Sequence, residues 1–397
     1  MDSPISLLKT QKQEIFFPKV DEFHIIGYSE FISNVVQEIK PLMKQRIQDK
    51  DQAQIQSEQN LQSLIKSLQL QELQEKEIKS SSQFSYQLIQ DNSFQQFEYC
   101  YAISINKDCS IVAAGSDKQI KIFEFKQGML KLNQIINEHK SYVSILNFMK
   151  QSKQFISGDW VIQRHSNPIN CLILNKNEDL FISCSDDKTI RFWAKKNKQN
   201  NEWICQQIIS DHIRWVYQII LNEQENQVIS CGKDGLILVI EYSESNKIWV
   251  VIQKIVENCR GFRIGFINDN LFTFKPIDGN LMHVYEKNSV SKEFTRNKDI
   301  ILTQGDDGYG LFPQQFIKQK QLIVCKHDKY INLIRKAQNG EFKVEQYIEF
   351  NTYYIYGQMS DDGEYLITWD NSSNEIQIRR YIEQRENYYI KYLQIYT

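Results

Sequence analysis

The chain has 397 residues, 41% hydrophobic and 24% charged, which is the composition of an ordinary folded protein with one large domain or two smaller ones. Its 47 Lys and Arg residues face 49 Asp and Glu residues, and this formal net charge of -2 excludes the basic excess typical of general nucleic-acid binding. No apolar run long enough for a membrane segment and no secretory leader is present, so we expect a cytoplasmic protein, with a nuclear location also open.

Residues 1–85 predict a helical, Gln-rich arm. Apolar residues recur at helical spacing on both sides of Pro41, which kinks or restarts the helix. Fewer than about four heptads are present. A short coiled coil that allows oligomerisation and a spacer that packs on its own domain both stay open. The run from Ser80 to Gln83 indicates a hinge.

From residue 90 to residue 397 the pattern changes to short apolar runs rich in Ile, Val, Phe and Tyr, separated by polar clusters. Many short strands at regular spacing are typical of an antiparallel all-β fold. Near the C-terminus, Asp362 and Gly363 form a strong hairpin-turn signal between two such strands.

One unit repeats along this region, most clearly from His165 to His212 and again from His212 to Ile255. Each copy has a histidine, a strand, a second strand ending in Ser-Cys, an aspartate, a third strand and a tryptophan opening a fourth. The spacing is close to the ~40–45 residues of one four-stranded propeller blade. The chain therefore resembles the WD40-repeat β-propeller family. That resemblance implies an all-β propeller of about seven blades, which begin near residues 96, 139, 165, 212, 260, 300 and 353.

In that family a buried polar network fixes each blade, and this resemblance assigns structural roles to several polar residues. In the clearest copy the matching positions are His165, Ser183, Asp187 and Trp193. The next copy keeps His212, Ser230 and Asp234 but has Ile240 in place of the tryptophan. We expect Asp186 to face solvent at the turn. A mutual network of this kind satisfies polar groups that would be costly to bury alone.

The second blade is predicted to be truncated. The copy opened by His139 reaches the next histidine, His165, before a full period is complete, so about one strand and its linker are missing. Either Trp160 to Gln163 move inward to form a three-stranded blade, or the sequence has lost a segment. Because such a blade exposes an unpaired edge, we expect residues 139–163 to be the weakest part of the fold.

The propeller resemblance implies a non-enzymatic scaffold that binds proteins or peptides on an end face. Candidate contacts lie just after a blade histidine or next to the turn aspartate: Tyr142, Asn167, Asp186, Arg214, Trp215 and Lys233. Arg214 and Trp215 are the strongest of these because exposed Trp and Arg dominate binding energy at interfaces. Packing of Trp215 within its own strand is the competing interpretation.

Two narrower functions stay open. The stretch from Ser183 to Trp193, followed by Trp203 and Cys205, is also similar to the WD-repeat protein of cytosolic iron–sulfur protein assembly, which would make the chain a targeting subunit. A substrate-reading subunit of a ubiquitin ligase would need arginines at the channel mouth, where only Arg214 and either Arg260 or Arg263 qualify.

An enzyme is not favoured, and we expect no catalytic residue, cofactor or metal site. No GxxxxGK[ST] loop, HExxH or CxxC is present, and the eight dispersed cysteines lack ligand spacing, as expected for small buried side chains in a reducing compartment. Asp306 and Asp307 could bind a cation, but the glycines around them favour a hairpin turn.

Overall fold

The computed structural model describes residues 61–63, 65–66, 84–89, 92–159, 165–196, 202–305, 307 and 312–383. The chain divides into two units, residues 1–80 and 81–397, and the second holds every strand described. Of the predicted arm, the structure describes five helical residues between Leu61 and Lys66, and Phe84 and Ser85, which lie in a β-strand rather than a helix. The rest of the arm, with its predicted coiled coil and hinge, lies outside the described residues. In the described ranges no helix is long and apolar enough to cross a bilayer.

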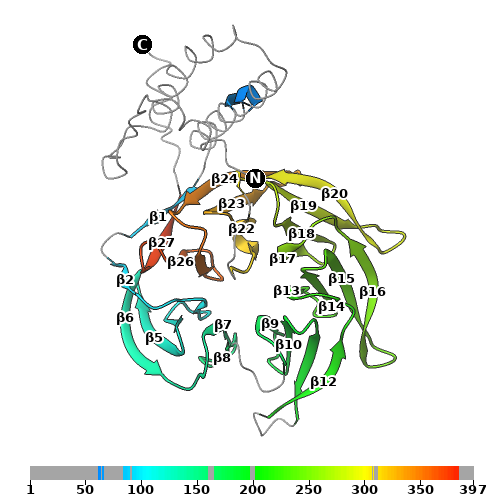
Figure 1. Ribbon diagram of the computed structural model, residues 1–397, viewed down its shortest axis with the longest axis horizontal. Helices are drawn as coiled ribbons and strands as arrows, with labels where there is room; N and C mark the ends of the chain where they lie inside the picture. Colours follow the sequence, from blue (N-terminus) through cyan, green and yellow to red (C-terminus); the bar gives the residue numbers. More distant parts are fainter. Residues whose placement is uncertain are drawn as a thin grey trace, which may run out of the picture. The chain divides into compact units, whose positions relative to one another are not determined.

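Six blades surround a central axis (Figure 1). Three of them are β3 (Ile103–Ile105), β4 (Ile111–Ser116), β5 (Gln119–Lys126) and β6 (Met129–Ile136); β9 (Ile169–Leu174), β10 (Leu180–Ser185), β11 (Ile190–Lys195) and β12 (Trp203–Ile209); and β13 (Val216–Leu221), β14 (Gln227–Gly232), β15 (Leu236–Ser243) and β16 (Ile248–Val256). The propeller is therefore all-β, as the sequence predicts.

The other three blades follow in chain order around the axis. They are β17 (Gly261–Asn268), β18 (Leu271–Pro276), β19 (Leu281–Lys287) and β20 (Phe294–Ile301); β21 (Gln315–Ile317), β22 (Leu322–His327), β23 (Tyr330–Lys336) and β24 (Phe342–Glu349); and β25 (Ile355–Met359), β26 (Tyr365–Asp370) and β27 (Glu375–Glu383) with β1 (Phe84–Leu88) and β2 (Phe94–Gln95). The blade predicted near residue 300 begins only at Gln315.

Tight turns with glycine at positive φ join the strands of a blade. Gly235 (φ 72°) lies between β14 and β15, and Gly363 (φ 71°) lies between β25 and β26. Glycine adopts this backbone conformation without the steric cost that a Cβ atom imposes. The turn signal at Asp362 and Gly363 thus corresponds to a hairpin in the last blade.

The last blade is closed by a strand from the start of the propeller. β1 pairs antiparallel with β27, with Phe84 opposite Glu383 and Leu88 opposite Arg379. The Tyr86 hydroxyl donates to the carbonyl oxygen of Gly363 at 2.5 Å. The sequence prediction began the propeller at residue 90 and missed this strand, because its pairing partner lies at the other end of the chain.

The predicted short blade is a two-stranded sheet, β7 (Val143–Phe148) paired with β8 (Phe155–Asp159). Trp160 to Gln163, the proposed third strand, lie outside the described residues. Six blades are complete, so the described residues do not establish the predicted count of seven.

The hydrophobic core lies between neighbouring blades. For example, the ring of Phe192 on β11 stacks on that of Trp249, in β16 of the next blade, with centroids 4.8 Å apart. Burying an aromatic or aliphatic side chain of this kind stabilises the fold by ~1.5–3 kcal/mol. The blades are thus held together mainly by the faces that they turn toward one another.

A buried charge cluster joins β17 to β22. The Asp307 carboxylate pairs with Lys326, Nζ to Oδ1 2.9 Å, and with Arg263, and all three side chains are at most 1% exposed. The Arg263 Nε also donates to the Phe312 carbonyl at 3.0 Å. Asp307 is therefore the counter-ion of two buried cations, which neither the hairpin-turn prediction nor the cation-site alternative anticipated, while Asp306 lies outside the described residues.

Beside this cluster, the buried imidazole of His327 makes the stability of the fold sensitive to acid. Burial, together with the nearby charges of Lys275, Arg263 and Lys326, lowers the pKa of His327 to about 3. Unfolded histidine titrates near 6.5. The unfolded chain therefore binds one more proton than the folded chain between these values, and stability falls as pH falls below about 6.5.

We expect His327→Gln to reduce this acid-induced loss. For one imidazole the slope is at most ~1.4 kcal/mol per pH unit. Urea unfolding of the two proteins at pH 7 and pH 5 measures the difference. An equal loss in wild type and variant would show that His327 already carries its proton in the folded state.

Candidate functional site

The polar residues singled out in the clearest repeat meet in the β9–β12 blade. His165 Nδ1 lies 2.7 Å from Asp187 Oδ2, and its Nε2 lies 2.8 Å from the Ser183 hydroxyl. The Trp193 indole N–H donates to the same hydroxyl at 2.8 Å. These four groups therefore join the loop before β9 to strands β10 and β11 and to the turn between those two strands.

The electrostatics of this clamp favour a neutral histidine and a charged aspartate. Burial lowers the pKa of His165 more than its hydrogen bond to Asp187 raises it. Burial opposes ionisation of Asp187, but hydrogen bonds from Thr189 and His165 outweigh it and lower the pKa of Asp187. The carboxylate therefore accepts hydrogen bonds as an anion.

Two more clamps of this type exist. In the β13–β16 blade, His212 Nδ1 lies 3.0 Å from Asp234, and its Nε2 lies 2.9 Å from the Ser230 hydroxyl. In the short sheet, His139 Nε2 lies 2.8 Å from the Ser157 hydroxyl and Nδ1 lies 3.2 Å from Asp159. This third clamp was not predicted from the sequence, although a histidine followed by "FISGD" was its signal.

In each clamp the histidine bridges a serine and an aspartate, as in the catalytic triad of a hydrolase. The surroundings of these residues differ from those of a triad. Ser183 and Ser230 are completely buried. The Ser183 oxygen also accepts the indole N–H of Trp193. A triad nucleophile must reach a substrate carbonyl. This arrangement therefore suits a structural link rather than nucleophilic attack.

The same end of the propeller carries a cationic, aromatic hollow between two blades. A hollow of about 450 Å³ is lined by Lys188, Ile213, Arg214, Trp215 and Lys233. Arg214 is exposed, Ile213 is 69% exposed and Trp215 is half-buried. The Lys233 ammonium lies 3.8 Å from the centroid of the Trp215 ring. Three cations around an indole form a surface that attracts an anionic group.

The remaining predicted contact positions lie on the same end. Asn167 and Tyr142 are exposed. Asp186 differs from the expectation that it faces solvent, because it is half-buried and accepts a hydrogen bond from Asn170 at 2.7 Å. Burial raises the pKa of Asp186. The bond to Asn170, on β9, ties the turn to the innermost strand.

A second feature of this end, which the sequence analysis missed except for Tyr142, is a group of tyrosines. Tyr99, Tyr142 and Tyr353 are 44%, 36% and 42% exposed. The rings of Tyr99 and Tyr101 stack at 5.4 Å, Tyr101 and Tyr142 meet at 5.6 Å, and Tyr353 and Tyr354 meet at 4.4 Å. Each precedes the first strand of its sheet, and a tyrosine at that position was the available signal. Exposed aromatic groups are enriched at protein interfaces.

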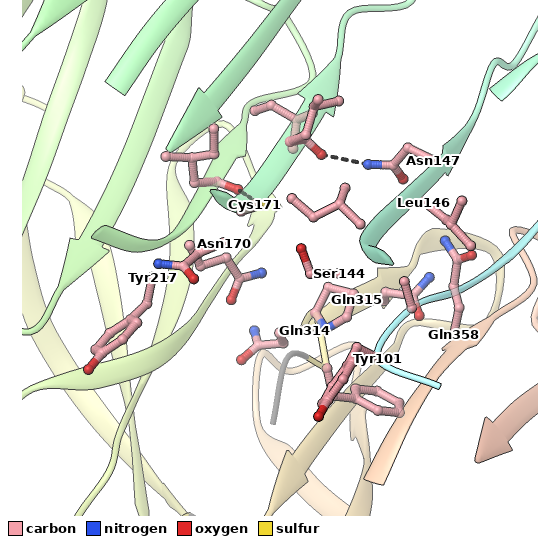
Figure 2. Close-up of a pocket in the computed structure, with 18 of the residues that line it drawn as sticks. Tyr101, Ser144, Leu146, Asn147, Asn170, Cys171, Tyr217, Gln314, Gln315 and Gln358 are labelled. Atoms are coloured by element: carbon pink, nitrogen blue, oxygen red, sulfur yellow. Dashed lines mark hydrogen bonds between the residues drawn. The ribbon is translucent and has the colours of Figure 1, made fainter. Parts of the chain in front are cut away.

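The central channel is lined largely by the first strands of the sheets. A cavity of about 220 Å³ lies there, and Figure 2 shows side-chain amides such as Asn147, Asn170, Gln314 and Gln358 around it. Several of these amides bond to the neighbouring sheet, as Asn147 does to the Leu172 carbonyl at 2.5 Å. The channel wall is therefore part of the packing between blades.

Arginines at the mouth of the channel are fewer than the sequence allows. Arg263 is 1% exposed and paired with Asp307, so it cannot contact a partner. Only Arg214 and Arg260 keep exposed side chains among the three arginines considered. A ring of arginines suited to phosphate recognition is therefore not present at these positions.

Within the described part of the chain, no group of three or more His, Cys, Asp or Glu side chains is placed to hold a metal ion. The eight cysteines are free thiols, and Cys100, Cys184, Cys231 and Cys325 are buried. Cys205, which carried part of the iron–sulfur resemblance, donates to the Gln207 carbonyl, Sγ to oxygen 3.6 Å.

Comparison with known proteins finds a matching family model and a relative. The family model for the WD domain, G-beta repeat, matches residues 92–124 and 160–194. A 68-residue stretch is 28% identical to "Protein SEC13 homolog" of Caenorhabditis briggsae, and covers 16% of this chain and 22% of that protein. The chain thus spans about a fifth of the length of this curated relative. Two WD40 repeats are therefore matched in a chain whose described residues form six complete blades around one axis, so the chain is a β-propeller that contains WD40 repeats.

Proposed function

We propose that this propeller is a non-enzymatic scaffold that binds an acidic segment of a partner protein on the end that carries the histidine clamps. The observation that carries the proposal is the hollow in which Lys188, Arg214 and Lys233 surround Trp215. Cationic side chains attract and orient acidic segments, and an indole supplies a large rigid contact area. The WD40 fold supports protein binding in general, and the hollow supports this location.

The tyrosine group extends the proposed contact area on the same end. Tyr99, Tyr142 and Tyr353 each expose part of the side chain at the surface, and the Tyr353 hydroxyl also donates to the Tyr354 hydroxyl at 3.4 Å. Tyrosine combines an apolar ring with a polar tip, which suits it to an interface that is wet when unbound. The acidic segment therefore occupies the hollow, and neighbouring parts of the partner cover the tyrosines.

Charge reversal in the hollow tests the proposal. We expect Arg214→Glu to reduce recovery of bound partners at least tenfold in quantitative affinity purification from the native cell, because it repels an acidic segment that Arg214 attracts. We expect Trp215→Ala to act in the same direction. Thermal melting should show an Arg214→Glu protein as stable as wild type, since this side chain is exposed.

A matched control is Lys247→Glu, which reverses an exposed charge in the turn between β15 and β16. Its partners should match those of the wild type. Equal recovery by Arg214→Glu and wild type would reject the hollow as the binding site. A chain lacking residues 1–80, which keeps β1, shows whether the first unit also recruits partners.

The partners recovered also decide between the narrower functions. Iron–sulfur apoproteins would support a targeting subunit, and ligase subunits would support substrate reading. For location, we propose the cytosol or the nucleus. Eight free cysteines support a reducing compartment, where thiols stay unpaired.

A further inference from the structure

The inner ring of the propeller runs without interruption through the two-stranded β7–β8 sheet. β7 contacts β3 and β4 on one side and β9 on the other. Asn147 on β7 donates to the Leu172 carbonyl on β9, and the Phe148 backbone N–H donates to the Ser104 hydroxyl on β3 at 3.4 Å. The short sheet therefore occupies a blade position as seen from the channel.

The outer ring is held together by a repeated glutamine contact. In three blades the side-chain amide of a glutamine on the outermost strand binds both the N–H and the C=O of one aromatic residue on the outermost strand of the next blade. The three pairs, with their two N–O distances, are Gln207 with Trp249 (2.6 and 2.8 Å), Gln253 with Phe294 (2.8 and 2.8 Å) and Gln346 with Tyr86 (3.3 and 2.7 Å).

These glutamines share one register position. Each lies opposite a third-strand residue directly before a β-bulge: Gln207 opposite Phe192, Gln253 opposite Val239 and Gln346 opposite Leu333. On β6, Gln134 holds this position opposite Ile122, again directly before the bulge. Gln134 is exposed, and its amide makes no hydrogen bond within the described part of the chain. The blade that follows it is the short sheet, which has no outer strand there.

The residues opposite the glutamines show a second consequence. Those in the three paired blades are almost completely buried, each in the same cluster as the aromatic residue that the glutamine binds: Phe192 (1% exposed), Val239 (0%) and Leu333 (0%). Ile122 is only partly buried. In the paired blades an aromatic side chain covers the third-strand residue, and its backbone binds the glutamine. Beside β6 no described residue covers Ile122 in this way, and none offers its backbone to Gln134.

β8 gives a third indication. In the second strands of the complete blades at most the first two residues are only partly buried, as in β10, and in β14 all six residues are buried. In β8 the first three residues, Phe155 to Ser157, are only partly buried. Among the described strands β8 pairs with β7 alone, so its outer edge offers unpaired backbone N–H and C=O groups.

The chain between β8 and the next blade is too short to supply the two outer strands that are absent beside β8. β8 ends at Asp159, at the clamp with His139, and the clamp of the next blade begins at His165. Both ends lie on the same face. A segment of this length can extend only ~11 Å away and return. By contrast, β11 and β12 have six and seven residues.

We propose that the β7–β8 sheet is the inner half of a seventh blade, which a β-hairpin from another polypeptide completes. The inner strand of the hairpin pairs with β8. An aromatic residue on its outer strand covers Ile122 and gives its backbone N–H and C=O to Gln134. A second copy of this chain does not fit, because every described hairpin is already part of a blade. This is strand addition to an open sheet edge.

A hairpin of known sequence provides the probe. The segment Leu236–Val256 is the β15–β16 hairpin. It carries Trp249, the aromatic residue that Gln207 of the preceding blade binds. Carried on a soluble fusion protein and added to the full chain, it should bind and slow amide exchange of residues 155–159 at least tenfold. Loss of the two amide hydrogen bonds in Gln134→Ala should weaken binding about tenfold.

Three controls make the result specific. Asn133→Ala removes a neighbouring amide on β6 that is not at the register position shared by the glutamines. This substitution should not change the affinity for the hairpin. Trp249→Ala in the hairpin should weaken binding as Gln134→Ala does. Capture of partners that depends on Arg214 should be unchanged in Gln134→Ala, so this test is independent of the proposed function.

Three results would overturn the proposal. The first is slow exchange of residues 155–159 in the free full chain, equal to that of β10 or β14, because the edge would then already be covered. The second is hairpin binding that Gln134→Ala does not change. The third is no binding of the hairpin at all.

Discussion

Replacement of Asp307 by asparagine should lower the free energy of unfolding by ~3–5 kcal/mol, because it leaves two buried cations without a counter-charge. Lys326 and Arg263 both pair with this carboxylate, and their side chains are 0% and 1% exposed. An amide keeps the size of the side chain but not its charge. Urea unfolding followed by fluorescence measures the change.

The control for Asp307→Asn is Asp278→Asn, the same substitution at an exposed turn residue, which should change stability by no more than ~0.5 kcal/mol. Should Asp307→Asn fail to fold, the double variant Asp307→Asn with Lys326→Met removes one of the unpaired cations and should recover folded protein. Equal stability of Asp307→Asn and wild type would show that the two cations are hydrated or otherwise balanced.

Replacement of Asp187 by alanine should cost ~2–4 kcal/mol, since a buried carboxylate that accepts several hydrogen bonds is lost. Asp187 accepts from His165 Nδ1 at 2.7 Å, from the Thr189 hydroxyl at 2.6 Å and from the Thr189 backbone N–H at 3.0 Å. Without it, His165 keeps its bond to Ser183 but loses the group that fixes the other ring nitrogen. Differential scanning calorimetry should show a lower melting temperature.

The comparison for Asp187→Ala is Asp361→Ala, at an exposed aspartate in another turn, where little change is expected. Hydrogen exchange then localises the effect, and the β9–β12 blade should exchange faster than the β21–β24 blade on the far side. A uniform change in every blade would contradict a local clamp. An unchanged melting temperature would remove the structural role assigned to the carboxylate.

The pattern of the repeat explains why much of the propeller was predictable. The clamp residues of one blade lie within about 30 positions of one another, as in His165 to Trp193, so their spacing recurs from copy to copy. The strands follow from alternation and turn residues, which are local properties. The His139 clamp was also within reach, but the shortened distance from Ser157 to Asp159 hid it.

Other features depend on residues that are far apart in the chain. Gln346 binds Tyr86, 260 positions away, and β1 pairs with β27 across the whole propeller. Asp307 lies beside Arg263 and Lys326 only because β17 and β22 belong to adjacent blades. Local sequence patterns do not predict such contacts, because a polar residue with a distant partner cannot be distinguished in the sequence from one that faces solvent.

By itself, the sequence determined most of the strands, the repeat, the order of the clamp residues and the incomplete second copy, because each is fixed by spacing within one blade. Only the tertiary structure decided which strand closes the ring, which charges are buried together, where lysines and arginine surround Trp215 and that Gln134 has nothing to bind in the described chain. Those features arise where blades meet, and closing the chain into a ring brings together residues whose separation in sequence carries no signal.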